Sequence, residues 1–111
     1  MKKETVLQND IRVVLSDAGL VRRNNVGTFY TAKGIPIAIG LPGEPDLTLF
    51  TRTGKTIFIE IKTPTGKQSK KQKHFQELIE SYGFAYIILR SVDQAKLLVQ
   101  EVQDERGIYK T

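Results

Sequence analysis

Three residues, Asp46, Glu60 and Lys62, have the types and the spacing that metal-assisted hydrolysis of a phosphodiester requires. Asp46 follows a turn rich in glycine and proline, and Glu60 and Lys62 end an apolar run that begins at Thr56. Alternate residues of a strand share one face, so Glu60 and Lys62 would be neighbours on one side of a sheet. The segment 46–50 is typical of an antiparallel partner, which would bring Asp46 alongside Glu60.

Hydrolysis of a phosphodiester needs a polarised phosphoryl oxygen, an activated water and compensation for negative charge on the leaving group. Mg²⁺ supplies much of this when one or two carboxylates hold it and several waters stay exchangeable. We expect Asp46 and Glu60 to be the carboxylate ligands and the backbone carbonyl of Ile61 to add a neutral oxygen. Lys62 would orient the attacking water or neutralise the transition state. A cross-strand salt bridge beside a turn explains the same side chains without catalysis.

The composition restricts the kind of protein. A chain of 111 residues predicts one domain over residues 1–111. Its 17 Lys and Arg against 12 Asp and Glu give a net charge of +5, which favours a polyanionic partner. The absence of cysteine excludes disulfides, thiol catalysis and thiolate metal sites, and indicates an intracellular compartment. No membrane span, signal peptide or organic cofactor is expected, so the predicted location is cytoplasmic.

Hydrophobic periodicity predicts an α/β fold, a mixed sheet with helices packed on it, in the order α-β-β-β-β-β-α-β-α. The first helix covers 4–18, with Gly19 as its stop, and the chain after residue 102 could form a loose tail. The apolar stripe of the second helix is Phe75, Leu78, Ile79 and Tyr82, and that of the third is Ala95, Leu98, Val99 and Val102. The other expected elements are a strand over 20–26, a hairpin over 28–39, strands over 46–50 and 56–62, capping boxes at 69–72 and 91–94 that open the second and third helices, and a central, buried strand over 84–89.

The motif from Gly43 to Leu47, followed by an apolar strand that ends in Glu60-Ile61-Lys62, resembles the PD-(D/E)XK nuclease superfamily. More narrowly, the chain resembles the virus-type replication-repair nuclease domain (VRR-NUC), which occurs as a short stand-alone protein in phages and bacteria. Further matching features are Glu4 in the first helix, Arg23 and Asn25 with Gly27 one place off, the Gly40–Gly43 approach, and Gln72 after the lysine. The resemblance implies a restriction-endonuclease-like fold, dependence on Mg²⁺ or Mn²⁺, and cleavage of DNA selected by shape more than by sequence.

The same resemblance assigns roles to individual residues. Asp46, Glu60 and Lys62 would carry the reaction, and Gln72 would support the lysine or the scissile phosphate. Glu4 would close the metal site as an outer or water-mediated ligand. Two simpler roles are open: Glu4 is favourable at a helix N-terminus, and Gln72 fits a capping box. Glu44 is not expected to be a ligand, because in an extended chain it points away from the site.

Basic residues near these motifs predict phosphate contacts on either side of the scissile bond, without base readout. For the lysines alone, a solvated helix face is the alternative. The single histidine, His74, is expected on a helix surface and not in catalysis. The expected nucleic-acid-binding residues are Lys67, Lys70, Lys71, Lys73, Lys55, Arg23 and Asn25.

The leading interpretation is a metal-dependent DNA endonuclease, either a homodimeric resolvase of four-way (Holliday) junctions or a related nuclease of branched DNA. A two-fold dimer presents two sites to a pseudo-symmetric junction. The hairpin over 28–39, with Phe29, Tyr30, Ile35 and Ile37, would supply a partner surface or fold back on its own core. Three alternatives are a less selective nuclease that nicks duplex or flap ends, a module that only binds DNA, and a plain structural subunit. A binding module has no reason to keep carboxylates beside its phosphate surface unless a cation intervenes.

Overall fold

The computed structural model describes the backbone of residues 2–25 and 27–108 and the side chains of residues 5–25 and 27–104. The observed order of helices and strands matches the predicted α/β order. In chain order the elements are α1 (Lys2–Leu15), β1 (Gly19–Arg23), β2 (Gly27–Tyr30), β3 (Pro36–Ile39), β4 (Leu47–Thr51), β5 (Thr56–Ile61), α2 (Lys70–Ser81), β6 (Ala85–Leu89) and α3 (Val92–Ile108). None of the helices within this described part is long and apolar enough to cross a membrane.

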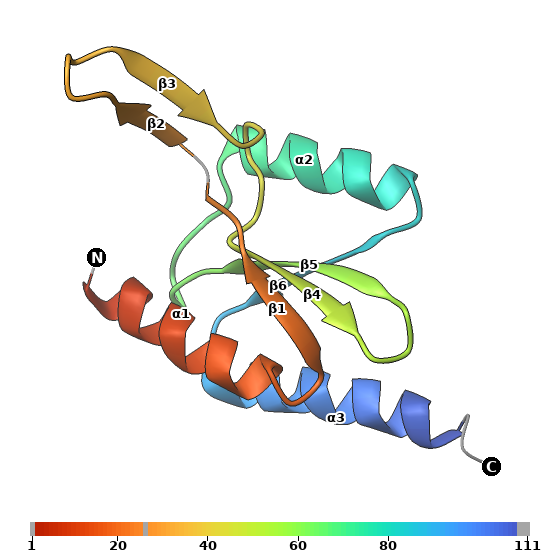
Figure 1. Cartoon of the computed structure of the whole chain (residues 1–111). Coiled ribbons are helices and arrows are strands. Elements are labelled where there is room, and N and C mark those ends of the chain that lie inside the picture. The colour runs from red at the N-terminus through yellow and green to blue at the C-terminus, as the bar shows by residue number, and fades with distance from the viewer. Residues whose placement is uncertain (1, 26, 109–111) are drawn as a thin grey trace.

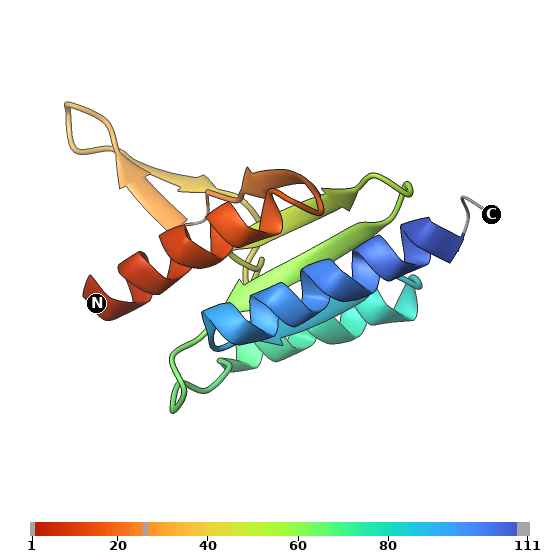
Figure 2. The same cartoon turned by 90° about the horizontal axis from the view of Figure 1, so that it is seen from below.

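Four strands form the main sheet in the order β1-β4-β5-β6. β4 is antiparallel to both β1 and β5, whereas β5 and β6 are parallel. A parallel pair needs a crossover connection, and α2 provides it. α2 covers one face of the sheet, and α1 and α3 lie together on the other (Figure 1 and Figure 2). The sheet is therefore mixed and flanked by helices, as predicted.

Alternation along β5 divides its side chains between two cores. Ile57, Ile59 and Ile61 enter the larger core with side chains of α1 and α3. Phe58 packs on the other face, against Phe75 of α2 in a T-shaped contact. Glu60 shares the Phe58 face, because residues two apart in a strand project the same way. The predicted separation of the three isoleucines from the Phe58 face is confirmed.

β6 lies at the edge of the described sheet, so the prediction of a central strand is wrong. Its side chains are nevertheless apolar on both faces, because α2 packs on one side and α3 on the other. Tyr86 belongs to the smaller core beneath α2, whereas Leu89 belongs to the larger core. Coverage by helices, and not a central position, explains the unbroken apolar run.

The helix boundaries and one helix face also differ from prediction. α1 ends at Leu15, and Gly19 opens β1 instead of stopping the helix. A Cβ at Gly19 would lie 2.1 Å from the carbonyl oxygen of Phe50, so this strand pairing requires glycine. In α2, Phe75 and Ile79 are buried as predicted, but Leu78 and Tyr82 are exposed. α3 continues to Ile108, so the predicted loose tail is wrong that far, and residues 109–111 lie outside the described part. The inward stripe of α3 is confirmed.

The hairpin of β2 and β3 forms a separate two-stranded sheet. Every residue of both strands is exposed, and the hairpin projects away from the body of the molecule (Figure 1). Exposed apolar side chains include Phe29, Tyr30, Ile35 and Ile37. The alternative in which this hairpin folds back on the core is therefore excluded.

Candidate active site

Asp46 enters the site from the loop that precedes β4. The register pairs Leu47 with Ile59, and its continuation by one residue sets Asp46 opposite Glu60. The carboxylate Oδ2 of Asp46 accepts a hydrogen bond from the backbone N–H of Ile61 at 2.7 Å. Asp46 and Glu60 therefore meet at one point of the sheet, as the strand pattern predicted.

Asn24, at the end of β1, holds the segment that carries Asp46. Its backbone N–H donates to the carbonyl oxygen of Asp46 at 2.9 Å. Its side-chain amide donates to the carbonyl oxygen of Pro45 at 3.0 Å and to the hydroxyl of Thr48 at 2.9 Å. The sequence did not single out Asn24. Its signal would have been a second asparagine beside Asn25, at the end of a strand expected to reach the site.

Arg23, which precedes Asn24, projects differently from what its predicted role requires. Arg23 pairs with Leu47, whose side chain lies in the core with α1 and α3. Cross-strand partners share a face, so Arg23 projects from the side of the sheet opposite to Glu60. Asn25 is exposed just after the strand. Asn24, and not Arg23, lies on the face of the acidic pair.

Glu60 is completely buried although it carries a carboxylate. Its Oε1 accepts a hydrogen bond from the hydroxyl of Tyr86. Its Oε2 is buried and accepts no hydrogen bond from any described residue, and the ammonium of Lys62 lies 3.8 Å away. A buried carboxylate oxygen without a hydrogen bond is costly. This atom therefore suits a site that a cation completes.

Tyr86 is the second important residue that the sequence did not single out. It pairs in register with Phe58, two positions before Glu60, and it is 7% exposed. Burial, followed by the hydrogen bond to Glu60 and the charge of Glu60, raises the pKa of Tyr86 far above its usual range. A hydrogen bond with Gln68 acts in the opposite direction. The hydroxyl thus keeps its proton and donates to the carboxylate. The signal in the sequence was one polar-tipped aromatic in an aliphatic run.

Lys62 lies where β5 ends and a tight turn begins. Its backbone N–H donates to the carbonyl oxygen of Leu89 at 3.1 Å. The guanidinium of Arg90 holds the turn, because its Nη1 donates to the carbonyl oxygens of Thr63 at 2.7 Å and Gly66 at 2.6 Å. The side chain of Lys62 is 17% exposed, so its ammonium lies at the boundary between the buried carboxylate and solvent.

Gln72 completes the capping box of α2. Its side-chain Oε1 accepts a hydrogen bond from the backbone N–H of Ser69 at 2.8 Å, and its backbone N–H donates to the Ser69 hydroxyl at 3.2 Å. The predicted cap is confirmed, and a further role toward Lys62 or phosphate stays a prediction. Glu44 closes its own loop by accepting from the N–H of Leu41 at 3.1 Å, which agrees with its exclusion as a ligand. The side chain of Glu4 lies outside the described residues.

The basic residues separate into two places. The lysine side chains around the start of α2 are exposed. The loop that leads to Asp46 packs against this part of α2, because a Cβ on Gly43 would lie 2.1 Å from the carbonyl oxygen of Lys71. His74 is exposed on the same helix, as expected. The lysines of this region are Lys67, Lys70, Lys71 and Lys73.

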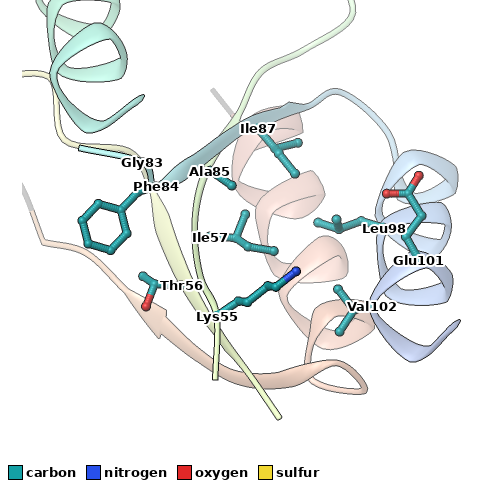
Figure 3. A pocket seen from close by; sticks show the side chains of 10 residues that line it. All are labelled: Lys55, Thr56, Ile57, Gly83, Phe84, Ala85, Ile87, Leu98, Glu101 and Val102. Atoms are coloured by element: carbon teal, nitrogen blue, oxygen red, sulfur yellow. The ribbon is translucent and has the colours of Figure 1, made fainter. Parts of the chain in front are cut away.

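Lys55 lies at the other end of β5, where it lines a cavity of about 490 Å³ between the starts of β5 and β6 and the helix α3. Figure 3 shows Lys55 reaching toward α3, with Leu98 and Val102 across the cavity. Lys55 stands five residues before Glu60, which corresponds to about 16 Å along the strand. The prediction that Lys55 flanks the acidic pair is therefore wrong, because its turn joins the opposite ends of the strands.

Within the described residues, no group of three or more Asp, Glu, His or Cys side chains is arranged to hold a metal ion. The available donors are the carboxylates of Asp46 and Glu60, with the backbone carbonyl of Ile61 as the expected neutral oxygen. Mg²⁺ keeps several waters and is bound by as few as one or two carboxylates. This donor set, with the Oε2 of Glu60 lacking a hydrogen bond, fits such an ion.

Comparison with known proteins agrees with the observed architecture. The VRR-NUC domain model matches residues 37–93, just over half of the chain, from β3 to the start of α3. A solved structure described as a VRR_NUC domain is 23% identical, with a TM-score of 0.65 over 88% of this chain and 95% of that chain. A search of curated proteins gives no match. The chain therefore belongs to the VRR-NUC family of nuclease domains.

Proposed function

We propose that this protein is an endonuclease that depends on Mg²⁺ or Mn²⁺ and cuts four-way junctions or other branched DNA. The observation that carries the proposal is the buried Oε2 of Glu60, which accepts no hydrogen bond from the described residues and lies beside Lys62. A purely structural ion pair would gain nothing from leaving a buried carboxylate oxygen without a hydrogen bond. A bound cation offsets that cost and places positive charge where a phosphate must approach.

Asp46 and Glu60 would hold the metal ion, with the Ile61 carbonyl as a third oxygen and Glu4 as an outer ligand. When bound, the ion polarises a phosphoryl oxygen and lowers the pKa of a water molecule. The chain's own residues position these groups. Asn24 holds the Asp46 segment, and Tyr86 orients Glu60. Lys62 supplies a point charge to orient the attacking water or to neutralise the developing negative charge. Gln72 would assist Lys62 or the phosphate.

The first turns of α2 support a phosphate-binding role. A helix N-terminus favours negative charge, yet the first turn of α2 contains no acidic residue. The positive charge of lysines is unfavourable at the N-terminus of an isolated helix, and the negative charge of a bound phosphate would offset that cost. We propose phosphate contacts by Lys67, Lys70, Lys71 and Lys73, with Asn25, which follows β1, as a further contact.

A homodimer is part of the proposal, because two symmetric nicks across a four-way junction require two sites related by two-fold symmetry. The projecting hairpin offers an apolar surface for this purpose, since all of its strand residues are exposed. DNA as substrate agrees with the positive net charge. The proposed place of action is the cytoplasm of a bacterial or phage-infected cell.

The test compares the native chain with Glu60→Gln and Lys62→Ala on a labelled four-way junction and a matched linear duplex. Each reaction is run with Mg²⁺, with Mn²⁺ and with chelator. The native protein should make paired nicks in the junction only when metal is present, whereas both variants should bind DNA without cutting it. Glu101→Gln, an exposed carboxylate outside the site, is the matched control and should cut normally.

Other outcomes separate the alternatives. Undiminished cleavage by both site variants would contradict the assignment of the site. Metal-dependent cutting of junction and duplex alike would favour a less selective nicking or flap nuclease. DNA that is bound and never cut by the native chain would favour a non-catalytic binding module.

A further inference from the structure

A groove of about 330 Å³ lies between the loop that leads to Asp46 and the outer side of α2. Leu41 and Leu78 are its large apolar walls, and they are 61% and 48% exposed. The ring of Phe75, which is 8% exposed, also lines the groove. Large aliphatic side chains that stay exposed beside one depression are typical of a binding surface. The lining residues are Leu41, Pro42, Lys71, His74, Phe75 and Leu78.

The charges around this groove favour an anionic occupant. The polar lining residues are Lys71 and His74, and no carboxylate from the described part of the chain lines the groove. Lys71 also belongs to the exposed lysines at the start of α2. The groove thus combines apolar and aromatic walls with a basic rim. A nucleotide matches that combination, because its base has apolar faces that stack on aromatic side chains and its phosphate is an anion.

The groove lies close to the candidate active site along the chain. Its loop wall rests on α2 at Gly43, which contacts the backbone of Lys71, and Asp46 follows three residues later. The four steps along the chain from Pro42 to Asp46 span at most about 14 Å. This distance corresponds to about four steps along one strand of B-DNA. A base only a few nucleotides from the scissile phosphate would reach the groove.

We infer that this groove binds an unpaired nucleobase of the DNA strand that is cut. The inference rests on the proposed nuclease function and specifies its substrate as DNA with unpaired bases close to the cut. A base inside a continuous duplex must first be unstacked and unpaired, whereas a base at a branch, bulge or flap is already released or costs little to release. The groove would therefore favour interrupted DNA over continuous duplex without reading sequence.

The test is a binding cycle in which both the protein and the DNA are changed. The double variant His74→Ala with Leu78→Ala truncates the groove at exposed positions of α2, where alanine favours the helix. The DNA is a duplex with a short run of unpaired adenines in one strand, the same duplex with abasic residues at those positions, and a continuous duplex. Affinity is measured by fluorescence anisotropy with chelator present, so that no strand is cut. Leu97→Ala, which is exposed on α3, is the matched control.

The double variant should bind the unpaired-adenine DNA about tenfold more weakly than the native chain does. The native chain should lose a similar factor when the adenines become abasic residues, and the variant should then lose nothing more. Binding of continuous duplex should be unchanged. An equal loss on the abasic DNA, or no loss on any DNA, would overturn the inference.

Two further results keep this inference distinct from the alternatives. A change of oligomeric state in the double variant, with unchanged DNA binding, would show that the groove receives a second copy of the chain and would overturn the inference. If the binding cycle shows this coupling but the native chain never cuts DNA, the groove is supported and the nuclease proposal is contradicted. The abasic arm changes only the DNA, so it tests the groove even if the variant is less stable.

Discussion

A single hydroxyl group, that of Tyr86, gives the two oxygens of Glu60 different surroundings. Oε1 accepts its hydrogen bond, and Oε2 accepts none from the described residues. Tyr86→Phe keeps the ring in the core and removes only this bond. Partners of a metal-binding side chain usually contribute about 10- to 100-fold to metal affinity. We therefore expect Tyr86→Phe to bind Mn²⁺ or Mg²⁺ at least about tenfold more weakly, measured by isothermal titration calorimetry.

The same variant should also unfold at lower urea concentration, because a buried acceptor that loses its donor costs about 1–3 kcal/mol. Tyr82→Phe is the matched control, since Tyr82 is exposed at the end of α2. The control should keep native stability and metal affinity. If Tyr86→Phe binds metal with native affinity, Tyr86 does not position Glu60 for metal binding.

At the scale of elements, the contact between the loop before β4 and the start of α2 joins the acidic pair to the lysines. Gly43 makes this contact with φ at +79°, and a Cβ there would meet the carbonyl oxygen of Lys71 at 2.1 Å. Gly54, in the turn between β4 and β5, has φ at +87°, but no atom of the described residues lies within 4 Å of a Cβ added there. The two glycines thus share a backbone conformation and differ in the space around them.

This difference gives a paired prediction. Gly54→Ala should cost about 1–2 kcal/mol of unfolding free energy for the left-handed conformation alone. Gly43→Ala should cost more, because the loop must also move away from α2, and it should slow metal-dependent cleavage. Urea denaturation and the junction assay measure the two effects. Equal losses of stability in the two variants would contradict this prediction, because they would show that displacing the loop from α2 costs no stability.

At the scale of the whole molecule, the projecting hairpin makes the chain extended. The Cα radius of gyration is 15.3 Å, whereas about 13 Å is expected for a compact chain of this length. Phe29 and Ile37 are cross-strand partners on the hairpin, and both are exposed. We expect a dimer in light scattering, and a monomer when both residues become threonine, which preserves strand propensity. Leu97→Ala should remain dimeric. A dimer that survives the double substitution would place the interface elsewhere.

The distribution of charge over the molecule gives a further prediction. Lys70→Ala with Lys71→Ala should weaken DNA binding and reduce the slope of log affinity against log salt by about 2, if each lysine neutralises one phosphate. Lys55→Ala with Lys96→Ala removes the same charge from exposed positions away from the site and should leave the slope nearly native. Equal changes of slope in both pairs would mean that net charge alone governs binding.

The sequence by itself determined the features that depend on local rules. Period-two alternation predicted that Glu60 and Lys62 are neighbours, and their charged groups lie 3.8 Å apart. The spacing of Ser69 and Gln72 predicted the cap of α2. The order of elements and the antiparallel pairing that brings Asp46 to Glu60 also followed, because a short turn leaves neighbouring strands few ways to pair. These features require only neighbouring residues, so they can be derived without knowing the rest of the fold.

Only the tertiary structure decided which distant residues complete the site. Tyr86 reaches Glu60 because β6 pairs in parallel with β5, and Asn24 reaches Asp46 because β1 pairs with β4. Lys55 was predicted beside the acidic pair, but it lies at the other end of the strand. Periodicity specifies the face of a side chain, but it does not specify the order of strands, the coverage of an edge strand by helices or the projection of a hairpin. Those depend on long-range packing, which joins segments far apart in the chain.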